Sequence, residues 1–219
     1  MKIFIQVLLF SVCISSCIKD DILADVIPAS VRIVSSVDTL AKDSTFLLEA
    51  VYFNTGGKKE EVALEWTSSN SSVLSINSNG LISGQTFGTS EVTVSFGEIS
   101  TSKTIVVDST TSAQSLMKGG QVNTTSSYAL FGNFTVDQVG TDLNMNFFSD
   151  YNASTALPGL YVYLTNNPNS NSGALEIGPV TTFSGAHSYT IPNVGINDYT
   201  YVLYFCKPFN VKVGHGAIN

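Results

Sequence analysis

Short segments in which apolar and polar residues alternate recur along most of this chain, and they predict β-strands. One clear case is residues 62–66, where Val62, Leu64 and Trp66 fall at every second position. Successive side chains of a strand point to opposite faces. We therefore expect these three to face a core, with Trp66 buried in it and Glu65 on the opposite face.

The predicted strands fall into two groups. The first group covers residues 31–34, 46–53, 62–66, 73–76, 81–82, 92–96 and 104–107. The second covers residues 128–136, 142–148, 160–164, 187–191, 201–206 and 209–213. Loops rich in Gly, Pro and Asn separate them, and Asn79-Gly80 predicts a tight type I′ hairpin turn.

This pattern predicts an all-β fold of two tandem β-sandwich domains. The first is an Ig-like sandwich at residues 27–108, and the second is a sandwich or barrel-like domain at 113–219. A polar stretch at 109–112 is the predicted linker. The chain has 219 residues, so each domain is long enough to bury a core of its own.

The N-terminus predicts export and lipid anchoring. Lys2 precedes an apolar run that is too short to span a bilayer comfortably, which indicates a signal peptide over residues 1–16. The residues that follow this run, 14–17, resemble a lipobox, which implies that Cys17 is diacylated and begins a lipidated tether at 17–26. An ordinary signal peptide that leaves Cys17 as a plain thiol is the alternative.

The tract after Cys17 bears on localisation. Lys19-Asp20-Asp21 is similar to the short tract that sends some Gram-negative lipoproteins to the outer face of the cell. The same charges also suit the solvated start of a tether. We expect a lipid-anchored outer-membrane protein that is exposed at the cell surface, with the membrane as a partner through the anchor.

The charge balance excludes one class of partner. The chain has 10 Lys and Arg against 17 Asp and Glu, for a formal net charge of −7. Nucleic-acid binding depends on clustered cations that neutralise phosphates, and the sequence contains no such cluster. We therefore expect no nucleic-acid partner.

The first domain resembles the bacterial Ig-like group-two family. The resemblance rests on residues 66–70, 79–84 and 91–94, together with Val73 and Gly88. It implies an Ig sandwich that acts as a spacer or an adhesive unit and has no catalytic residues. The acidic residues of this region are scattered and form no calcium-binding loop.

The second domain resembles the DM-thirteen family, which is described as an electron-transfer domain. The similar segments are residues 131–134, 158–164, 188–192 and 204–214. The resemblance implies that Cys206 is the redox residue, as a bare thiol or as a ligand to a group such as haem. This sequence departs from the family pattern at Leu160 and Phe205.

Cys206 is unusual apart from any family. With Cys13 removed and Cys17 acylated, it is the one free thiol of the mature protein, so it has no intramolecular disulfide partner. Such a cysteine is either buried as a small apolar residue or used chemically. A reactive thiol needs partial exposure and a nearby cation, and Lys207 is the adjacent cation in sequence.

Two histidines are candidate cofactor ligands. His187 and His215, with the thioethers of Met117 and Met145, make a copper or haem site with Cys206 conceivable. No serine stands in a Gly-x-Ser-x-Gly elbow, and the sequence does not decide whether the chain is an enzyme. The leading hypothesis is a surface lipoprotein with a redox or ligand-binding domain centred on Cys206. The alternative is a non-catalytic adhesion protein that binds a glycan or a protein.

Overall fold

The computed structural model describes residues 26–113 and 117–219. The predicted signal peptide, Cys17 and most of the predicted tether lie outside the described residues. Within the described ranges the regular elements are strands and one short 3-10 helix, η1 (Lys207–Phe209). The all-β prediction is therefore confirmed. Neither of these two ranges contains a helix that is long and apolar enough to cross a bilayer.

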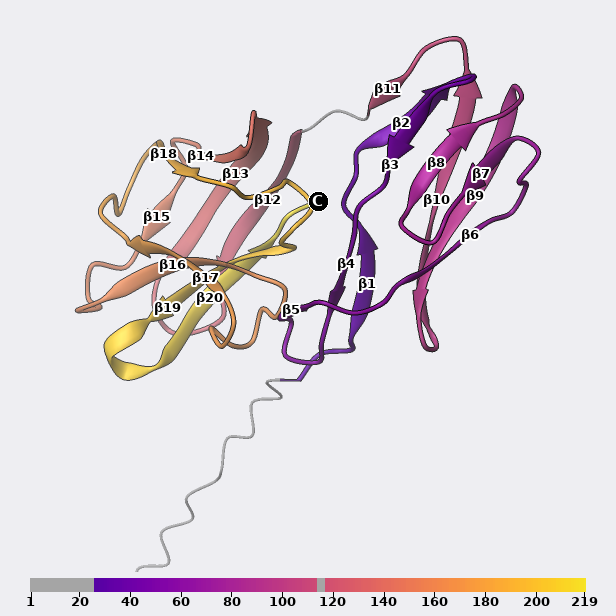
Figure 1. Ribbon diagram of the computed structural model, residues 1–219. Helices are drawn as coiled ribbons and strands as arrows, with labels where there is room; N and C mark the ends of the chain where they lie inside the picture. The colour runs from indigo at the N-terminus through magenta and orange to yellow at the C-terminus, as the bar shows by residue number, and fades with distance from the viewer. Residues whose placement is uncertain (1–25, 114–116) are drawn as a thin grey trace, which may run out of the picture.

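Three sheets build the first domain (Figure 1), in the orders β11-β2-β10-β9-β6, β3-β8-β7 and β1-β4-β5. The strands are β1 (Ser30–Ile33), β2 (Val37–Ala41), β3 (Thr45–Leu47), β4 (Ala50–Phe53), β5 (Lys59–Glu60), β6 (Glu65–Ser68), β7 (Leu74–Ile76), β8 (Leu81–Gly84), β9 (Gly88–Phe96), β10 (Ile99–Asp108) and β11 (Ser112–Ala113). Buried residues of β2, β7, β8, β9 and β10 form one core, and Trp66 packs against it while remaining half-buried.

The turn between β7 and β8 differs from the predicted type I′ hairpin. A type I′ turn needs positive φ at both central residues, but only Gly80 has it, with φ of 84°. The Asn77 carbonyl instead accepts a bond from the Gly80 N–H at 3.0 Å. The Asn77 side-chain oxygen accepts two further hydrogen bonds, from the backbone amides of Asn79 and Leu81. Asn77 therefore organises the loop, which the Asn79-Gly80 pair alone did not indicate.

The polar segment predicted as a linker at residues 109–112 contacts the first domain at its end. Ser112 and Ala113 form β11, which pairs with β2 of that domain. Thr111 accepts a hydrogen bond from the Ala41 N–H at 3.0 Å. These residues therefore pack on the first domain, while the bounds of the linker stay a prediction.

One curled sheet of nine strands forms the second domain, in the order β17-β16-β19-β20-β12-β13-β14-β18 with β15 beside β13. The strands are β12 (Met117–Thr124), β13 (Leu130–Val139), β14 (Asp142–Phe147), β15 (Asn152–Ala153), β16 (Leu160–Thr165), β17 (Leu175–Pro179), β18 (His187–Ile191), β19 (Tyr201–Cys206) and β20 (Val211–Ala217). Residues 180–185 bridge the gap between its edges, since Val180 bonds to Leu160 and Phe183 to Ala153. The result is a nearly closed barrel with an apolar interior.

Glycine allows two strands of this barrel to approach closely. A Cβ added at Gly120, Gly214 or Gly216 would collide with a backbone carbonyl of the facing strand. These residues lie on β12 and β20, which pair through Asn123 and Thr124. The absence of side chains there lets the first and last strands of the domain meet.

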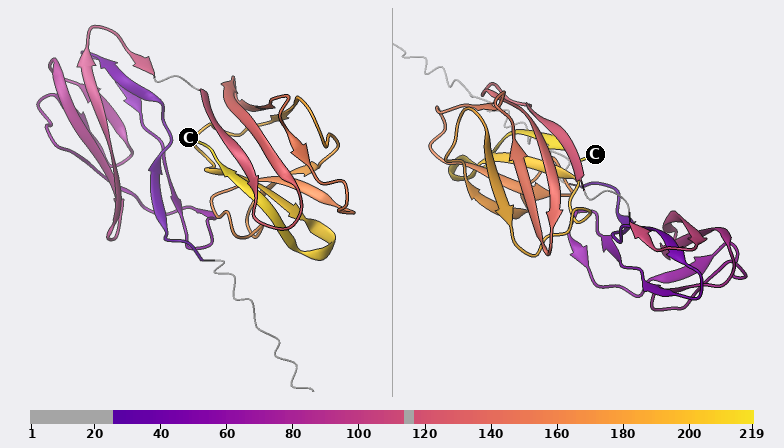
Figure 2. Two further views of the ribbon diagram at one scale, coloured as in Figure 1. Left: turned by 180° about the vertical axis from the view of Figure 1, so that it is seen from behind. Right: turned by 90° about the horizontal axis from the view of Figure 1, so that it is seen from above.

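The two domains lie side by side as separate lobes (Figures 1 and 2). Polar bonds connect them: the Arg32 guanidinium of β1 donates to the Asn166 side chain at 2.7 Å and to the Asp198 carbonyl at 2.9 Å. The Asn197 side chain donates to the Val34 carbonyl at 2.8 Å. These bonds fix one relative placement of the lobes and leave a cleft between them.

Candidate functional site

Cys206 lies at the end of β19 with its side chain inside the barrel. It is 0% exposed and belongs to the same core cluster as Val202 and Tyr204. Lys207 does not approach this face, because it bonds Glu176 at 2.7 Å and lies over the Tyr161 ring. Reactive thiols are accessible and have a cation nearby, whereas this thiol packs as a small apolar residue. Its redox role remains a prediction.

The two candidate histidines lie on different faces of the barrel wall. His187 stacks on Phe147, a member of the interior cluster, with ring centroids 4.9 Å apart. His215 pairs directly with Leu203, whose side chain belongs to the opposite face from Cys206. Directly paired residues share a face, so His215 lies across the sheet from the thiol. In the described part of the chain, no three His, Cys, Asp or Glu side chains gather into a metal-binding group.

The barrel interior instead contains an aromatic cluster around Phe147. Its ring contacts Phe134, Tyr151, His187, Tyr189 and Tyr204. The hydroxyls of Tyr151, Tyr189 and Tyr204 and the Nε2 atom of His187 are buried in this cluster. Burial raises the pKa of Tyr189 and raises that of Tyr204 well above its ordinary value. These phenols therefore stay neutral.

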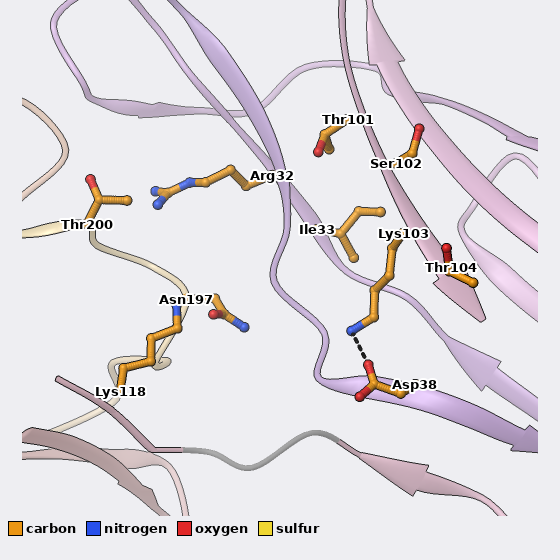
Figure 3. A pocket seen from close by; sticks show the side chains of 10 residues that line it. All are labelled: Arg32, Ile33, Asp38, Thr101, Ser102, Lys103, Thr104, Lys118, Asn197 and Thr200. Atoms are coloured by element: carbon orange, nitrogen blue, oxygen red, sulfur yellow. Dashed lines mark ion pairs between the residues drawn. The ribbon is translucent and has the colours of Figure 1, made fainter. Parts of the chain in front are cut away.

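The cleft between the domains is a different kind of site (Figure 3). One chamber of this cleft has a volume of about 470 Å³, within the range of ligand pockets. Strands of both domains line it with the side chains of Arg32, Ile33, Asp38, Thr101, Ser102, Lys103, Thr104, Lys118, Asn197 and Thr200. Hydroxyl, amide and cationic groups dominate this lining.

Arg32 is held in place without a carboxylate partner. Besides its bonds to Asn166 and Asp198, its guanidinium lies over the Phe53 ring, 4.1 Å from the centroid. Its Nε is buried without a partner. Burial lowers the pKa of Arg32 to about 10, although the Asp198 charge acts in the opposite direction. The pocket thus keeps a cation whose charge is only partly compensated.

Lys118 faces Arg32 from the second domain. It makes no ion pair or hydrogen bond with the described residues, and it is half-buried. Burial, and secondly the charge of Arg32, lower the pKa of Lys118. Lys103 differs, because Asp38 pairs with it at 3.1 Å (Figure 3). Two cations that repel each other across the cleft create a site where an anion is stabilised.

A smaller chamber of about 270 Å³ adjoins the same arginine. Phe53, which supports the Arg32 guanidinium, lines it together with Tyr199, Lys58 and Lys59. Five of the chain's 10 basic residues therefore line the two chambers, against only two acidic ones, Asp38 and Asp198. The whole chain has a net charge of −7, so the excess of basic over acidic residues around the two chambers is opposite in sign to the charge of the chain.

Sequence patterns did not indicate the cleft residues. Arg32 and Lys118 lie in strands of different domains, and neither belongs to a motif. They come together only because the domains dock through Arg32, Asn166 and Asn197. The one indirect indication in the sequence is the scarcity of basic residues, which makes any gathering of them conspicuous.

Comparisons with known proteins give no family for this chain. No family model matches it, and no curated protein matches it. Among solved structures, the S-layer protein SbsC domains 4 and 5 are 14% identical, with 86% of this chain and 96% of that chain covered and a TM-score of 0.31. The S-layer protein rSbsC(31-844) is 16% identical, with 86% and 27% covered and a TM-score of 0.31. Likeness at this level carries no functional argument.

Proposed function

We propose that this chain is a surface lipoprotein of the cell envelope that binds an acidic saccharide in the cleft between its two β-domains. The observation that supports it most directly is the Arg32–Lys118 pair, two half-buried cations that hydrogen-bond no carboxylate of residues 26–113 and 117–219. Burying unpaired charge costs free energy. A bound anion would offset that cost, which is why the site favours a negatively charged ligand.

The other groups in the cleft favour a sugar over a bare anion. Thr101 offers a hydroxyl, and Asn197, which donates one bond to Val34, keeps a further N–H and its carbonyl for sugar hydroxyls. In the smaller chamber the half-buried Tyr199 provides apolar surface for the face of a sugar ring. Carboxylated saccharides combine both requirements. In this proposal the first domain supplies one wall of a composite site in addition to any role as a spacer.

Titration calorimetry on the purified chain tests this proposal. The ligands are short oligosaccharides containing uronic or sialic acids, each beside its uncharged methyl ester, with sodium sulfate as a free anion. We expect the acids to bind, the esters to bind much more weakly and sulfate alone to bind poorly. Lys118→Met should weaken acid binding by about tenfold or more, since a hydrogen bond to a charged group is worth roughly 1.5–3 kcal/mol.

Lys42→Met is the matched control. Lys42 is an exposed lysine paired with Asp43, and it lines neither chamber. It should leave binding unchanged. If acid and ester bind equally, or if both lysine variants behave alike, the saccharide proposal is wrong. Binding of sulfate as strong as that of any saccharide would mean that the cleft recognises only the anion.

A further inference from the structure

The hairpin that joins β19 to β20 ends in an exposed apolar tip, which we define as residues 207–211. All five residues are exposed. Phe209 is 66% exposed and Val211 40% exposed, with Pro208 next to them. Isolated apolar residues are common on protein surfaces, but this tip places three close together at an extremity of the molecule.

The tip is rigid. The Lys207 N–H donates to the Gly159 carbonyl at 3.0 Å, and a Cβ added at Gly159 would lie 2.7 Å from the Pro208 ring. Asn210 adopts the left-handed conformation, with φ of 52°, and closes the turn. These contacts hold the backbone of the tip in a turn that leaves the Phe209 side chain 66% exposed. An aromatic side chain held in this way is suited to enter an apolar phase.

The charges beside the tip are already used within the protein. Lys207 bonds both carboxylate oxygens of Glu176, and Lys212 donates to the Asn169 side chain at 3.4 Å. The tip therefore does not offer a free basic patch for anionic headgroups. Its contact with another surface has to be mainly apolar.

The position of the tip identifies the surface that it meets. In Figures 1 and 2 (left), the β19–β20 hairpin and the start of the described chain at Val26 lie at the same, lower end of the molecule. Nine residue steps separate Val26 from Cys17. That length of chain spans at most roughly 30 Å when fully extended. An acyl anchor on Cys17 therefore keeps this end of the protein close to the bilayer.

We propose that Phe209 inserts into the lipid surface to which the chain is anchored. This inference rests on the lipid anchor of the proposed function but not on the saccharide site. The anchor supplies a high local concentration of lipid, so a contact too weak to recruit the protein from solution still orients it. Membrane contact through the tip then determines which side of the two lobes faces away from the bilayer.

Tryptophan placed at the tip tests the contact. The lipidated chain carrying F209W is reconstituted into phosphatidylcholine vesicles containing brominated lipid, with and without phosphatidylglycerol. F87W is the control. Phe87 is 64% exposed and precedes Gly88, which pairs with Val107 near the end of β10 at the top of Figure 1. Trp66, the one native tryptophan, packs against the first domain's core and gives both variants the same background.

We expect bromine quenching of F209W fluorescence to exceed that of F87W at least twofold, with a blue-shifted emission, and to be the same with and without phosphatidylglycerol. Equal quenching of the two variants overturns the proposal, and so does quenching that requires the anionic lipid. Vesicle flotation is measured first, because a chain that does not float overturns the anchor itself. Saccharide binding by F209W, measured in parallel, reports separately on the cleft.

Discussion

The interior of the barrel and the cleft between the domains both gather polar side chains, but their surroundings differ. In the barrel, Tyr204 and Cys206 are enclosed among apolar side chains, and His187 stacks on one of these, Phe147. In the cleft, Arg32 and Lys118 are charged, face each other and border an open chamber. The comparison teaches that residue types usually associated with chemistry serve here to fill a core. More informative for function are the charged side chains of Arg32 and Lys118, which border an open chamber and bond no carboxylate of the described residues.

The largest expected effect comes from the centre of the aromatic cluster. Phe147→Ala removes the ring that contacts five other rings, so it should destabilise the protein by about 3–5 kcal/mol. Urea unfolding followed by circular dichroism measures this loss. Phe148→Ala, at a neighbour that is 48% exposed, should change stability by no more than about 0.5 kcal/mol. A loss below about 1 kcal/mol at Phe147 would mean that the interior is loosely packed.

A smaller loss of stability is expected at Cys206, where the test also distinguishes a buried thiol from a reactive one. Cys206→Ser places a hydroxyl among apolar side chains, and we expect a loss of about 1–3 kcal/mol with saccharide binding unchanged. In the native protein a thiol reagent should modify Cys206 only as fast as the barrel opens. Rapid modification under native conditions would show that Cys206 is not enclosed in the barrel core. It would support the redox role predicted from the sequence.

The smallest expected effect is an increase in the free energy of unfolding. Lys118→Met removes a half-buried cation that faces Arg32, so the unliganded protein should become more stable by roughly 0.5 kcal/mol after solvent screening. The pKa of Lys118 is lower in the folded than in the unfolded protein. The destabilising contribution of Lys118 itself therefore diminishes as the pH rises toward 10.5, because the folded protein loses this proton before the unfolded chain does.

Urea midpoints of the two proteins between pH 8 and pH 10 measure this difference, which should narrow as the pH rises. A Lys118→Met variant that is less stable than wild type at pH 8 would show that the lysine has a stabilising partner. The charge of Lys118 would then already be stabilised within the protein, as polar groups of the barrel interior are. That result would contradict the proposal that the cleft binds an anion.

The fold was predictable where local pattern determines it. Residues 142–147 and 201–206 alternate or run apolar in the way that barrel strands require, and the structure places strands there. The details that depend on single hydrogen bonds were not predictable. Asn77 controls the turn before β8, and Thr111 holds the segment leading to β11 against the first domain. Neither contact has a counterpart in strand periodicity.

The candidate site was less predictable than the fold. Cys206 and His187 were identified because of their residue types, and the structure places both at the interior of one barrel while His215 lies across the sheet. Arg32 and Lys118 belong to no motif, since their proximity depends on how two separately folded domains dock. Such tertiary placement is the information that a single sequence lacks.

The pairing of β12 with β20 has a consequence for the order of folding. These are the first and last strands of the barrel, and their glycines let them meet. The barrel therefore closes only after the final strand has been synthesised, whereas the first domain has all its strands earlier. Pairings between distant segments form slowly. Until that closure the thiol of Cys206, which the folded barrel encloses, stays accessible to solvent, so the speed of the last step determines how long it is exposed.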